Sequence, residues 1–130
     1  MMAKRKNEAL TRGEEEIMQL LWKLGEANVN DLLAEMTEPK PKYTTVATFL
    51  KILEDKQYVA RKPNGRGYSY YPLVEKSDYA DRLMTSVLGN YFDGSLVQLV
   101  SFFSKRESIP LDEMNEIEAI IRAARAEEKN

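Results

Sequence analysis

The sequence contains no cysteine and no histidine among its 130 residues. These absences exclude disulfide bonds, metal sites built on thiolates or imidazoles, and catalysis by a cysteine nucleophile or a serine–histidine–aspartate triad. A histidine pH switch is excluded as well. An enzyme that uses lysine and carboxylates remains open, but no nucleophile and base stand out as a pair. We therefore expect a protein that is not an enzyme and that has no cofactor and no metal site.

Long apolar runs are also absent. No stretch approaches the roughly 18 apolar residues that a membrane span needs. The basic residues Lys4, Arg5 and Lys6 near the start are not followed by the apolar segment of a signal peptide. We expect a soluble, cytoplasmic protein without membrane insertion. Hydrophobic residues make up 43% of the chain, which is near the globular norm and indicates a folded protein.

The spacing of apolar residues predicts two helices in the first 36 residues. Thr11 and Glu14 have capping-box spacing at the start of the first helix, and Gly25 is placed to end it. Asn30 is expected to cap the second helix. The two prolines of residues 37–42 predict a loop after it.

A third helix is expected from Tyr43 or Thr44 to Lys56, followed by a β-hairpin. Strands are predicted at residues 58–61 and 68–71, and the intervening Pro-Asn-Gly-Arg-Gly sequence is typical of a turn. Three short helices followed by a hairpin indicate a winged helix-turn-helix fold. The fold class is therefore mainly α with a small β-hairpin. The buried face of the third helix is predicted to contain Val46, Phe49, Leu50 and Leu53.

Residues 1–75 are expected to form this winged-helix domain, and residues 76–130 a helical dimerisation domain. Ser77 is placed to cap a helix that ends near Gly89 and Asn90, and Pro110 to open a last helix whose final residues fray.

The segment between these two helices, residues 95–104, is apolar over most of its circumference and must be covered on both sides. A second copy of the chain would cover it in a two-fold symmetric homodimer. The alternative is that it packs back onto the amino-terminal half as one domain. The residues expected in the dimer contact are Leu83, Val87, Leu96, Leu99, Val100, Phe102, Phe103, Met114, Ile117 and Ile121.

Charge is distributed unevenly along the chain. The segment 40–76, called the basic segment below, has eight basic and three acidic residues and a net charge of +5, whereas residues 77–130 carry −4. The basic segment contains the third helix and the hairpin, which are the parts of a winged helix that face DNA.

Hydroxyl and basic side chains mark the candidate DNA-binding surface. Threonine hydroxyls near the start of a helix can bond to phosphates or base edges, and their methyl groups can contact thymine. Arg66 lies between two glycines at the hairpin tip and would reach a phosphate, with Arg61 and Lys62 expected on the same face. An ordinary helix surface and a solvated turn are the alternatives. The candidate residues are Lys42, Tyr43, Thr44, Thr45, Thr48, Lys51, Arg61, Lys62 and Arg66.

The chain resembles the penicillinase-repressor (BlaI, MecI and CopY) family of winged-helix transcriptional regulators, over about residues 10–126. The resemblance rests on LTRGEEEIMQLLWKLG, YTTVATFLKILEDKQYV, YSYYPLVEKSDY and FDGSLVQLVSFF. It implies a dimeric repressor whose third helix reads the major groove of a palindromic operator through Tyr43, Thr44, Thr45 and Thr48. Lys51, Arg61 and Arg66 would bind the DNA backbone.

The resemblance also bears on the inducing signal. In the β-lactam members a membrane-bound sensor protease triggers cleavage at an Asn-Phe bond, and the nearest match here is Ser101-Phe102, without the asparagine. The copper-sensing members use a cysteine cluster that this chain lacks. We expect a repressor of a β-lactam-resistance-like or other stress-response operon, with double-stranded DNA, a second copy and a sensor protease as partners. A winged helix that binds proteins instead of DNA is the alternative.

Overall fold

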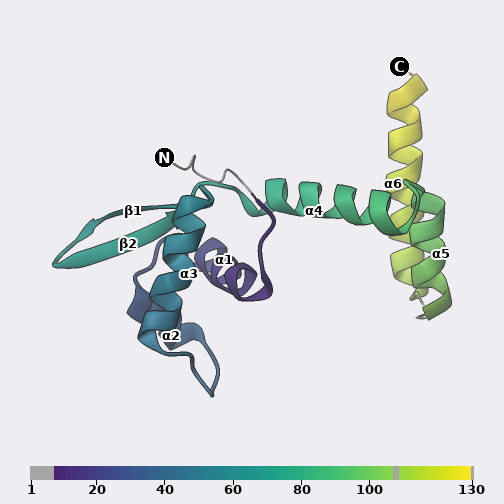
Figure 1. The fold of residues 1–130 in the computed structure, drawn as a ribbon. Helices are drawn as coiled ribbons and strands as arrows, with labels where there is room; N and C mark the ends of the chain where they lie inside the picture. Colours follow the sequence, from purple (N-terminus) through teal and green to yellow (C-terminus); the bar gives the residue numbers. More distant parts are fainter. Residues whose placement is uncertain (1–7, 107–108, 130) are drawn as a thin grey trace. The chain divides into compact units, whose positions relative to one another are not determined.

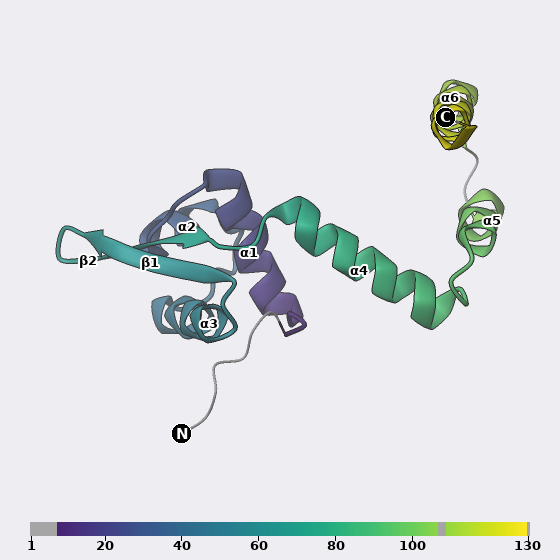
Figure 2. The same cartoon turned by 90° about the horizontal axis from the view of Figure 1, so that it is seen from above.

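The computed structural model describes residues 8–106 and 109–129. Lys4, Arg5 and Lys6, and with them the expectation about a signal peptide, lie outside the described residues. The chain divides into two compact units, Met1–Arg82 and Leu83–Asn130 (Figures 1 and 2). In the described part of the chain, no helix combines the length and the apolar character that crossing a membrane requires.

Helix α1, Arg12–Leu24, begins and ends as the sequence predicts. The Thr11 hydroxyl accepts a hydrogen bond from the Glu14 N–H at 3.3 Å, and the Glu14 carboxylate accepts one from the Thr11 N–H at 3.3 Å. Gly25 closes the helix with a φ of 82°, in the region that glycine adopts without strain. The predicted capping box is confirmed.

Helix α2, Val29–Glu35, is capped by Asn28, so the assignment of the cap to Asn30 was wrong. The Asn28 side chain accepts from the Asp31 N–H at 2.7 Å, and the Asp31 carboxylate accepts from the Asn28 N–H at 3.0 Å. Asn30 has leucine three residues later and therefore has no such reciprocal partner.

Helix α3, Tyr43–Asp55, buries Val46, Leu50 and Leu53, as predicted. Phe49, expected on the same face, is only half-buried and packs against the edge of the core. A Cβ atom at Gly13 would lie 2.6 Å from Phe49 Cζ, so a larger residue at position 13 would require the Phe49 ring to move.

Strands β1, Val59–Asn64, and β2, Gly67–Pro72, form an antiparallel hairpin, called the wing below. Its loop is Gly65-Arg66, with a φ of 63° at Gly65. Pro63, predicted in the turn, lies instead within β1 opposite Tyr68. A proline is tolerated there because β2 pairs with Ala27 on its other side, which leaves β1 at an edge of the sheet.

The core of the first unit lies between α1, α2, α3 and the base of the wing (Figure 1). Two backbone hydrogen bonds between Ala27 and Tyr70, at 3.0 and 2.8 Å, attach the segment after α1 to the wing. These contacts hold the wing beside α3. The buried hydrophobic residues are Ile17, Met18, Leu21, Ala27, Val29, Leu32, Val46, Leu50, Leu53, Tyr58, Val59 and Val74.

Helix α4, Lys76–Tyr91, belongs to the first unit as far as Arg82 and then to the second. It begins at Lys76, not after a cap at Ser77, and it continues through Gly89 and Asn90, where an end was expected. A single glycine costs a helix only about 1 kcal/mol. The helix is terminated instead by the turn at residues 93–94, as Gly94 N–H donates to Leu88 O at 2.9 Å.

Helices α5, Leu96–Arg106, and α6, Leu111–Lys129, complete the second unit. Helix α6 begins after Pro110 as predicted, but it reaches Lys129, so residues 126–129 are helical and not frayed. Among the described residues of this unit, no side chain is fully buried. The second unit therefore displays an apolar surface that nothing in its own described residues covers.

Candidate nucleic-acid interface

The outer face of α3 is polar and open to solvent. Thr44, Thr45, Thr48 and Lys51 are exposed, and they lie opposite the buried side of the helix. Tyr43, at the first position of α3, is 54% exposed. The face that the sequence predicted to read DNA is thus free of contacts that would hide it within the first unit.

The hydroxyl of Thr48 is not free in the way that the sequence suggested. Its Oγ1 donates to Thr44 O at 2.9 Å, one helical turn earlier. The hydroxyl proton is therefore already used. Thr48 can still offer its methyl group to a thymine, and its oxygen can still accept a hydrogen bond.

The amino terminus of α3 lacks a side-chain cap. Lys42 occupies the cap position and makes no side-chain hydrogen bond to the first amides, whereas α1 and α2 both have complete capping boxes. The first N–H groups of a helix carry partial positive charge and suit a phosphate. Lys42 adds a full positive charge at the same place.

Arg61 and Lys62 lie on opposite faces of the wing, contrary to the expectation that they share one. Successive residues of a strand alternate between faces. Arg61 Nε lies 3.4 Å from Glu54 Oε2 of α3, and its guanidinium lies 4.3 Å from the centre of the Tyr68 ring. Lys62 Nζ instead lies 2.7 Å from Glu26 Oε1, which raises the pKa of Lys62 through that hydrogen bond. Arg61 therefore faces the α3 side of the wing, and Lys62 does not.

Arg66 and Lys51 are exposed cations of this surface without an ion pair among the described residues. Both are exposed, and within residues 8–106 and 109–129 no carboxylate lies within ion-pair distance of either. Arg66 stands at the tip of the wing beside Gly65. Both can therefore contact a phosphate without first breaking an ion pair.

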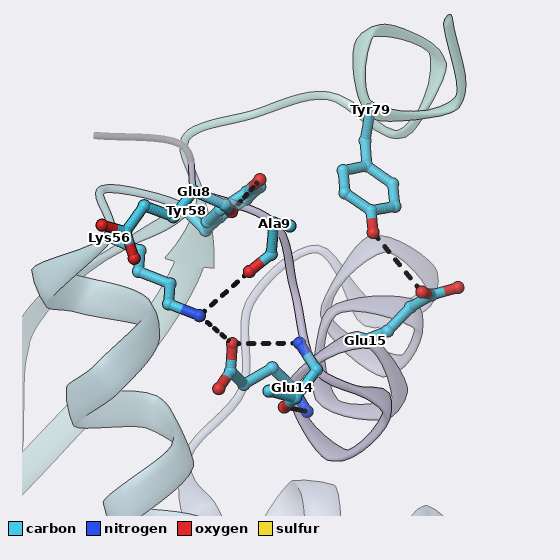
Figure 3. A network of polar contacts seen from close by, with 8 residues as sticks. Glu8, Ala9, Glu14, Glu15, Lys56, Tyr58 and Tyr79 are labelled. Atoms are coloured by element: carbon cyan, nitrogen blue, oxygen red, sulfur yellow. Dashed lines mark hydrogen bonds and ion pairs between the residues drawn. The ribbon is translucent and has the colours of Figure 1, made fainter. Parts of the chain in front are cut away.

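Lys56, counted with the basic segment, is buried and cannot contribute its charge to a surface. Its Nζ lies 2.6 Å from Glu14 Oε1 and donates to Ala9 O at 3.0 Å (Figure 3). Despite the desolvation that burial causes, hydrogen bonds from Lys56 and Thr11 lower the pKa of Glu14. Lys56 is thus engaged in a buried ion pair with Glu14, and the net charge that the basic segment shows to solvent is smaller than its composition suggests.

A polar hollow of about 280 Å³ lies between α3 and the wing. Tyr43 and Tyr68 line it together with Asn30 and Asn64, neither of which was predicted to belong to the DNA-binding surface. Asn30 had been assigned to helix capping. The capping box that Asn28 forms with Asp31 was the signal in the sequence that Asn30 is free for another role.

The residues expected at the dimer contact lie in the second unit, and all of them except the half-buried Val87 and Leu99 are exposed. An apolar hollow of about 520 Å³ is lined by Met84, Tyr91 and Phe92, which were not predicted, with Val87, Leu99, Phe102 and Phe103, which were. Ser101 and Phe102, the candidate cleavage residues, lie inside α5. The exposed predicted residues are Leu83, Leu96, Val100, Phe102, Phe103, Met114, Ile117 and Ile121.

A comparison with known families and proteins identifies the protein family. The family model described as penicillinase repressor matches residues 10–123. The chain belongs to the penicillinase-repressor family. The resemblance inferred from the sequence is thereby confirmed.

Relatives within this family match the sequence over most of the chain. The methicillin resistance regulatory protein MecI of Staphylococcus aureus (strain N315) is 28% identical over 115 residues, 86% of this chain and 92% of MecI. The penicillinase repressor of Bacillus licheniformis is also 28% identical, over 86% of this chain and 88% of its own length. The solution structure of the DNA-binding domain of the repressor BlaI covers 58% of this chain and 93% of that domain, with a TM-score of 0.51 and 28% identity. The winged-helix fold is therefore confirmed.

Within the two described ranges, no group of three or more acidic side chains could hold a metal ion. The features that stand out are the open face of α3, the wing and the apolar surface of the second unit.

Proposed function

We propose that the protein is a sequence-specific DNA-binding transcriptional repressor that acts as a homodimer on a palindromic operator. The observation that carries the proposal is the polar outer face of α3 beside the wing, in a member of a family whose relatives are named as repressors. Thr44 and Thr48 would meet base edges, and Lys51 and Arg66 would meet phosphates. The proposal includes no enzymatic activity and places the protein in the cytoplasm with the DNA that it regulates.

The apolar surface of the second unit supports the homodimer. Leu96 is 65% exposed, Val100 54% and Phe103 53%, although large apolar side chains rarely gather at the surface of a monomer. A second copy would bury them through the same patch on both protomers, as two-fold symmetry requires. In this arrangement residues 76–130 would form the dimerisation domain and residues 1–75 the DNA-binding domain.

A two-fold dimer would match an operator made of two inverted half-sites. Each α3 would enter a major groove, and successive grooves on one side of the duplex are about 10 base pairs apart. Phosphate contacts would dominate the affinity, and the face of α3 would select the sequence.

Relatives also suggest what the operon and the signal would be. MecI is named for methicillin resistance and the Bacillus licheniformis relative for penicillinase. We therefore propose a β-lactam-resistance-like or other stress-response operon, with a sensor protease upstream. The candidate bond Ser101-Phe102 lies within α5, so cleavage there would require α5 to unwind locally.

Selection of genomic fragments by the purified full-length protein tests this function. The fragments would be retained at about 150 mM salt, where non-specific binding is weak, and then sequenced. Recovery of a few fragments that share a two-fold motif supports the repressor. Recovery of a broad, unrelated pool or of nothing would contradict it, and would favour a winged helix that binds another protein.

A further inference from the structure

Three aromatic rings attach the first turns of α4 to the winged helix. Tyr79 of α4 lies with its ring centre 5.6 Å from that of Trp22 in α1. It lies 6.0 Å, in an edge-to-face arrangement, from Tyr58, which directly precedes β1. Aromatic pairs at such distances are worth about 0.5–1.5 kcal/mol each beyond the area that they bury.

Hydrogen bonds reinforce the same attachment. The Tyr79 hydroxyl donates to Glu15 Oε2 at 3.4 Å (Figure 3), and the Trp22 indole N–H donates to Val74 O at 2.8 Å, just before α4 begins. Burial and the neighbouring Glu15 raise the pKa of Tyr79 to about 12, so the phenol keeps its proton at neutral pH.

Glu14, the neighbour of Glu15, connects this attachment to α3. Glu14, the preceding residue of α1, holds Lys56 at the carboxyl end of α3. Adjacent carboxylates on the first turn of α1 therefore hold the end of α3 and the start of α4 (Figure 3). Such an arrangement relates the direction of α4 to the direction of α3 within the first unit.

Helix α4 is also the connection between the two units. Its residues up to Arg82 belong to the first unit and those from Leu83 to the second, and no loop interrupts the helix between them. In the proposed dimer, the path of the chain from the dimer contact to each α3 therefore passes through the turn that contains Tyr79.

We infer that Tyr79 is a positioning residue that determines which half-site spacing the dimer accepts. The inference rests on the proposed function. By holding the start of α4 against Trp22 and Glu15, Tyr79 sets the direction in which α4 leaves the winged helix. One added base pair moves a half-site by about 3.4 Å and rotates it by about 35°, since a turn of roughly 10 base pairs spans about 34–36 Å. If the direction of α4 is fixed, the dimer binds only palindromes whose half-sites have the matching spacing. If the direction of α4 varies, the dimer also binds palindromes with other spacings.

Effective concentration gives the expected size of the effect. After one α3 binds its half-site, the second α3 of the dimer binds as an intramolecular event, which raises the affinity for the palindrome. This gain in affinity is lost when the second α3 cannot reach its half-site. Loss of the Tyr79 contacts lowers affinity for the full palindrome by about tenfold or more and leaves half-site affinity within about twofold.

The experiment compares the full-length protein with its Tyr79→Ala and Tyr79→Phe variants. Binding is measured to a half-site duplex, to the selected palindrome, and to palindromes with one to four base pairs inserted at the centre. We expect Tyr79→Ala to reduce the ratio of palindrome to half-site affinity and to flatten the dependence on spacing. Tyr79→Phe retains the ring contacts and should lie close to the wild type.

Two further variants separate positioning from stability. Leu33→Ala removes a partly buried side chain from α2. It should lower the stability of the protein without changing the ratio of palindrome to half-site affinity. Tyr79→Leu keeps apolar bulk and takes the place of Tyr79→Ala if that variant does not fold. An unchanged ratio and spacing preference in the folded Tyr79 variant would overturn the inference alone. A wild type that shows no preference for the palindrome over the half-site would overturn the proposed dimeric repressor and the inference with it.

Discussion

Glu14 Oε1 lies 2.6 Å from Lys56 Nζ, and both side chains are about 95% buried. The same carboxylate completes the capping box of α1, and Lys56 also donates to Ala9 O. One ion pair therefore joins the start of α1 to the end of α3. Burial makes this pair costly to form and costlier to break.

Removing one partner of this pair should destabilise the protein strongly. Lys56→Ala leaves the Glu14 carboxylate buried without its cation, and we expect the free energy of unfolding to fall by about 3–5 kcal/mol. Replacing both residues by apolar ones, as in Glu14→Leu with Lys56→Met, should restore much of the loss because no charge is then buried. Urea denaturation followed by circular dichroism measures both changes.

An exposed ion pair provides the matched control for Lys56. Lys23 Nζ lies 3.0 Å from Glu35 Oε2, with side chains that are 66% and 34% exposed. Lys23→Ala should cost less than about 1 kcal/mol. Equal losses in Lys56→Ala and Lys23→Ala would show that burial of the Glu14 pair has no energetic consequence.

Acid should weaken the fold through Glu14. Its pKa is lowered from the usual value of 4.5 in the folded protein, so its contribution to stability is complete above that value and is lost as the pH falls through the lower, folded pKa. Glu14→Gln cannot titrate at this position. We expect the stability gap between wild type and Glu14→Gln to be largest above about pH 4.5 and to narrow below it. Denaturation curves between pH 3 and 7 measure the gap, and a gap that stays constant over this range would contradict the prediction.

The buried ion pair also shows where sequence reasoning reaches its limit. Thr11, Glu14 and Gly25 were assigned correctly because a capping box and a terminal glycine are local patterns. Lys56 was counted as a surface charge because its partner is 42 residues away in the chain and meets it only in the folded unit. Pro63 was placed in a turn because its place at a sheet edge depends on the pairing of β2 with Ala27.

The candidate nucleic-acid interface also has features that the sequence predicted and features that it did not. The period of α3 was enough to place Thr44, Thr48 and Lys51 on its outer face. The hydrogen bond from Thr48 to Thr44, and the ion pairs of Arg61 and Lys62, depend on rotamers and neighbours that no spacing pattern contains. The sequence thus predicted which residues of the interface are exposed. It did not predict which of their polar groups already form hydrogen bonds or ion pairs.

Thr48 should read DNA with its methyl group. Because its hydroxyl proton is given to Thr44 O, Thr48→Val keeps the outward methyl and should retain operator affinity. Thr48→Ser keeps the hydroxyl, loses the methyl, and should cost about 1 kcal/mol and relax the preference at one base pair. Fluorescence anisotropy against operators with single substitutions compares the two. The assignment is wrong if Thr48→Val binds worse than Thr48→Ser.

Arg66 should contribute affinity without selectivity. It stands exposed at the wing tip with no ion pair among the described residues, so Arg66→Ala should weaken binding to all duplexes alike. The slope of log affinity against log salt should become shallower by about one phosphate contact. Arg66→Lys keeps the charge and should preserve the slope. A loss confined to particular sequences would instead show that Arg66 contacts bases.

A charge on the apolar surface of α5 should dissociate the dimer. Phe103 is 53% exposed and lines the apolar hollow of the second unit with Phe102 and Leu99. In the proposed dimer these side chains are buried against the second copy, where an unpaired carboxylate would cost several kcal/mol. Phe103→Glu should therefore sediment as a monomer at concentrations where the wild type is dimeric.

The same variant separates dimerisation from DNA reading. The proposed DNA-binding surface lies in the first unit, so Phe103→Glu should keep half-site affinity and lose only the gain from the palindrome. Gln98→Glu places an equal charge at an exposed polar position of the same helix, and should remain dimeric. If Phe103→Glu remained a dimer, or if both variants dissociated alike, the dimer contact would lie elsewhere than on this face of α5. Sedimentation velocity and anisotropy on the same samples distinguish these outcomes, because the first reports assembly and the second reports the face of α3.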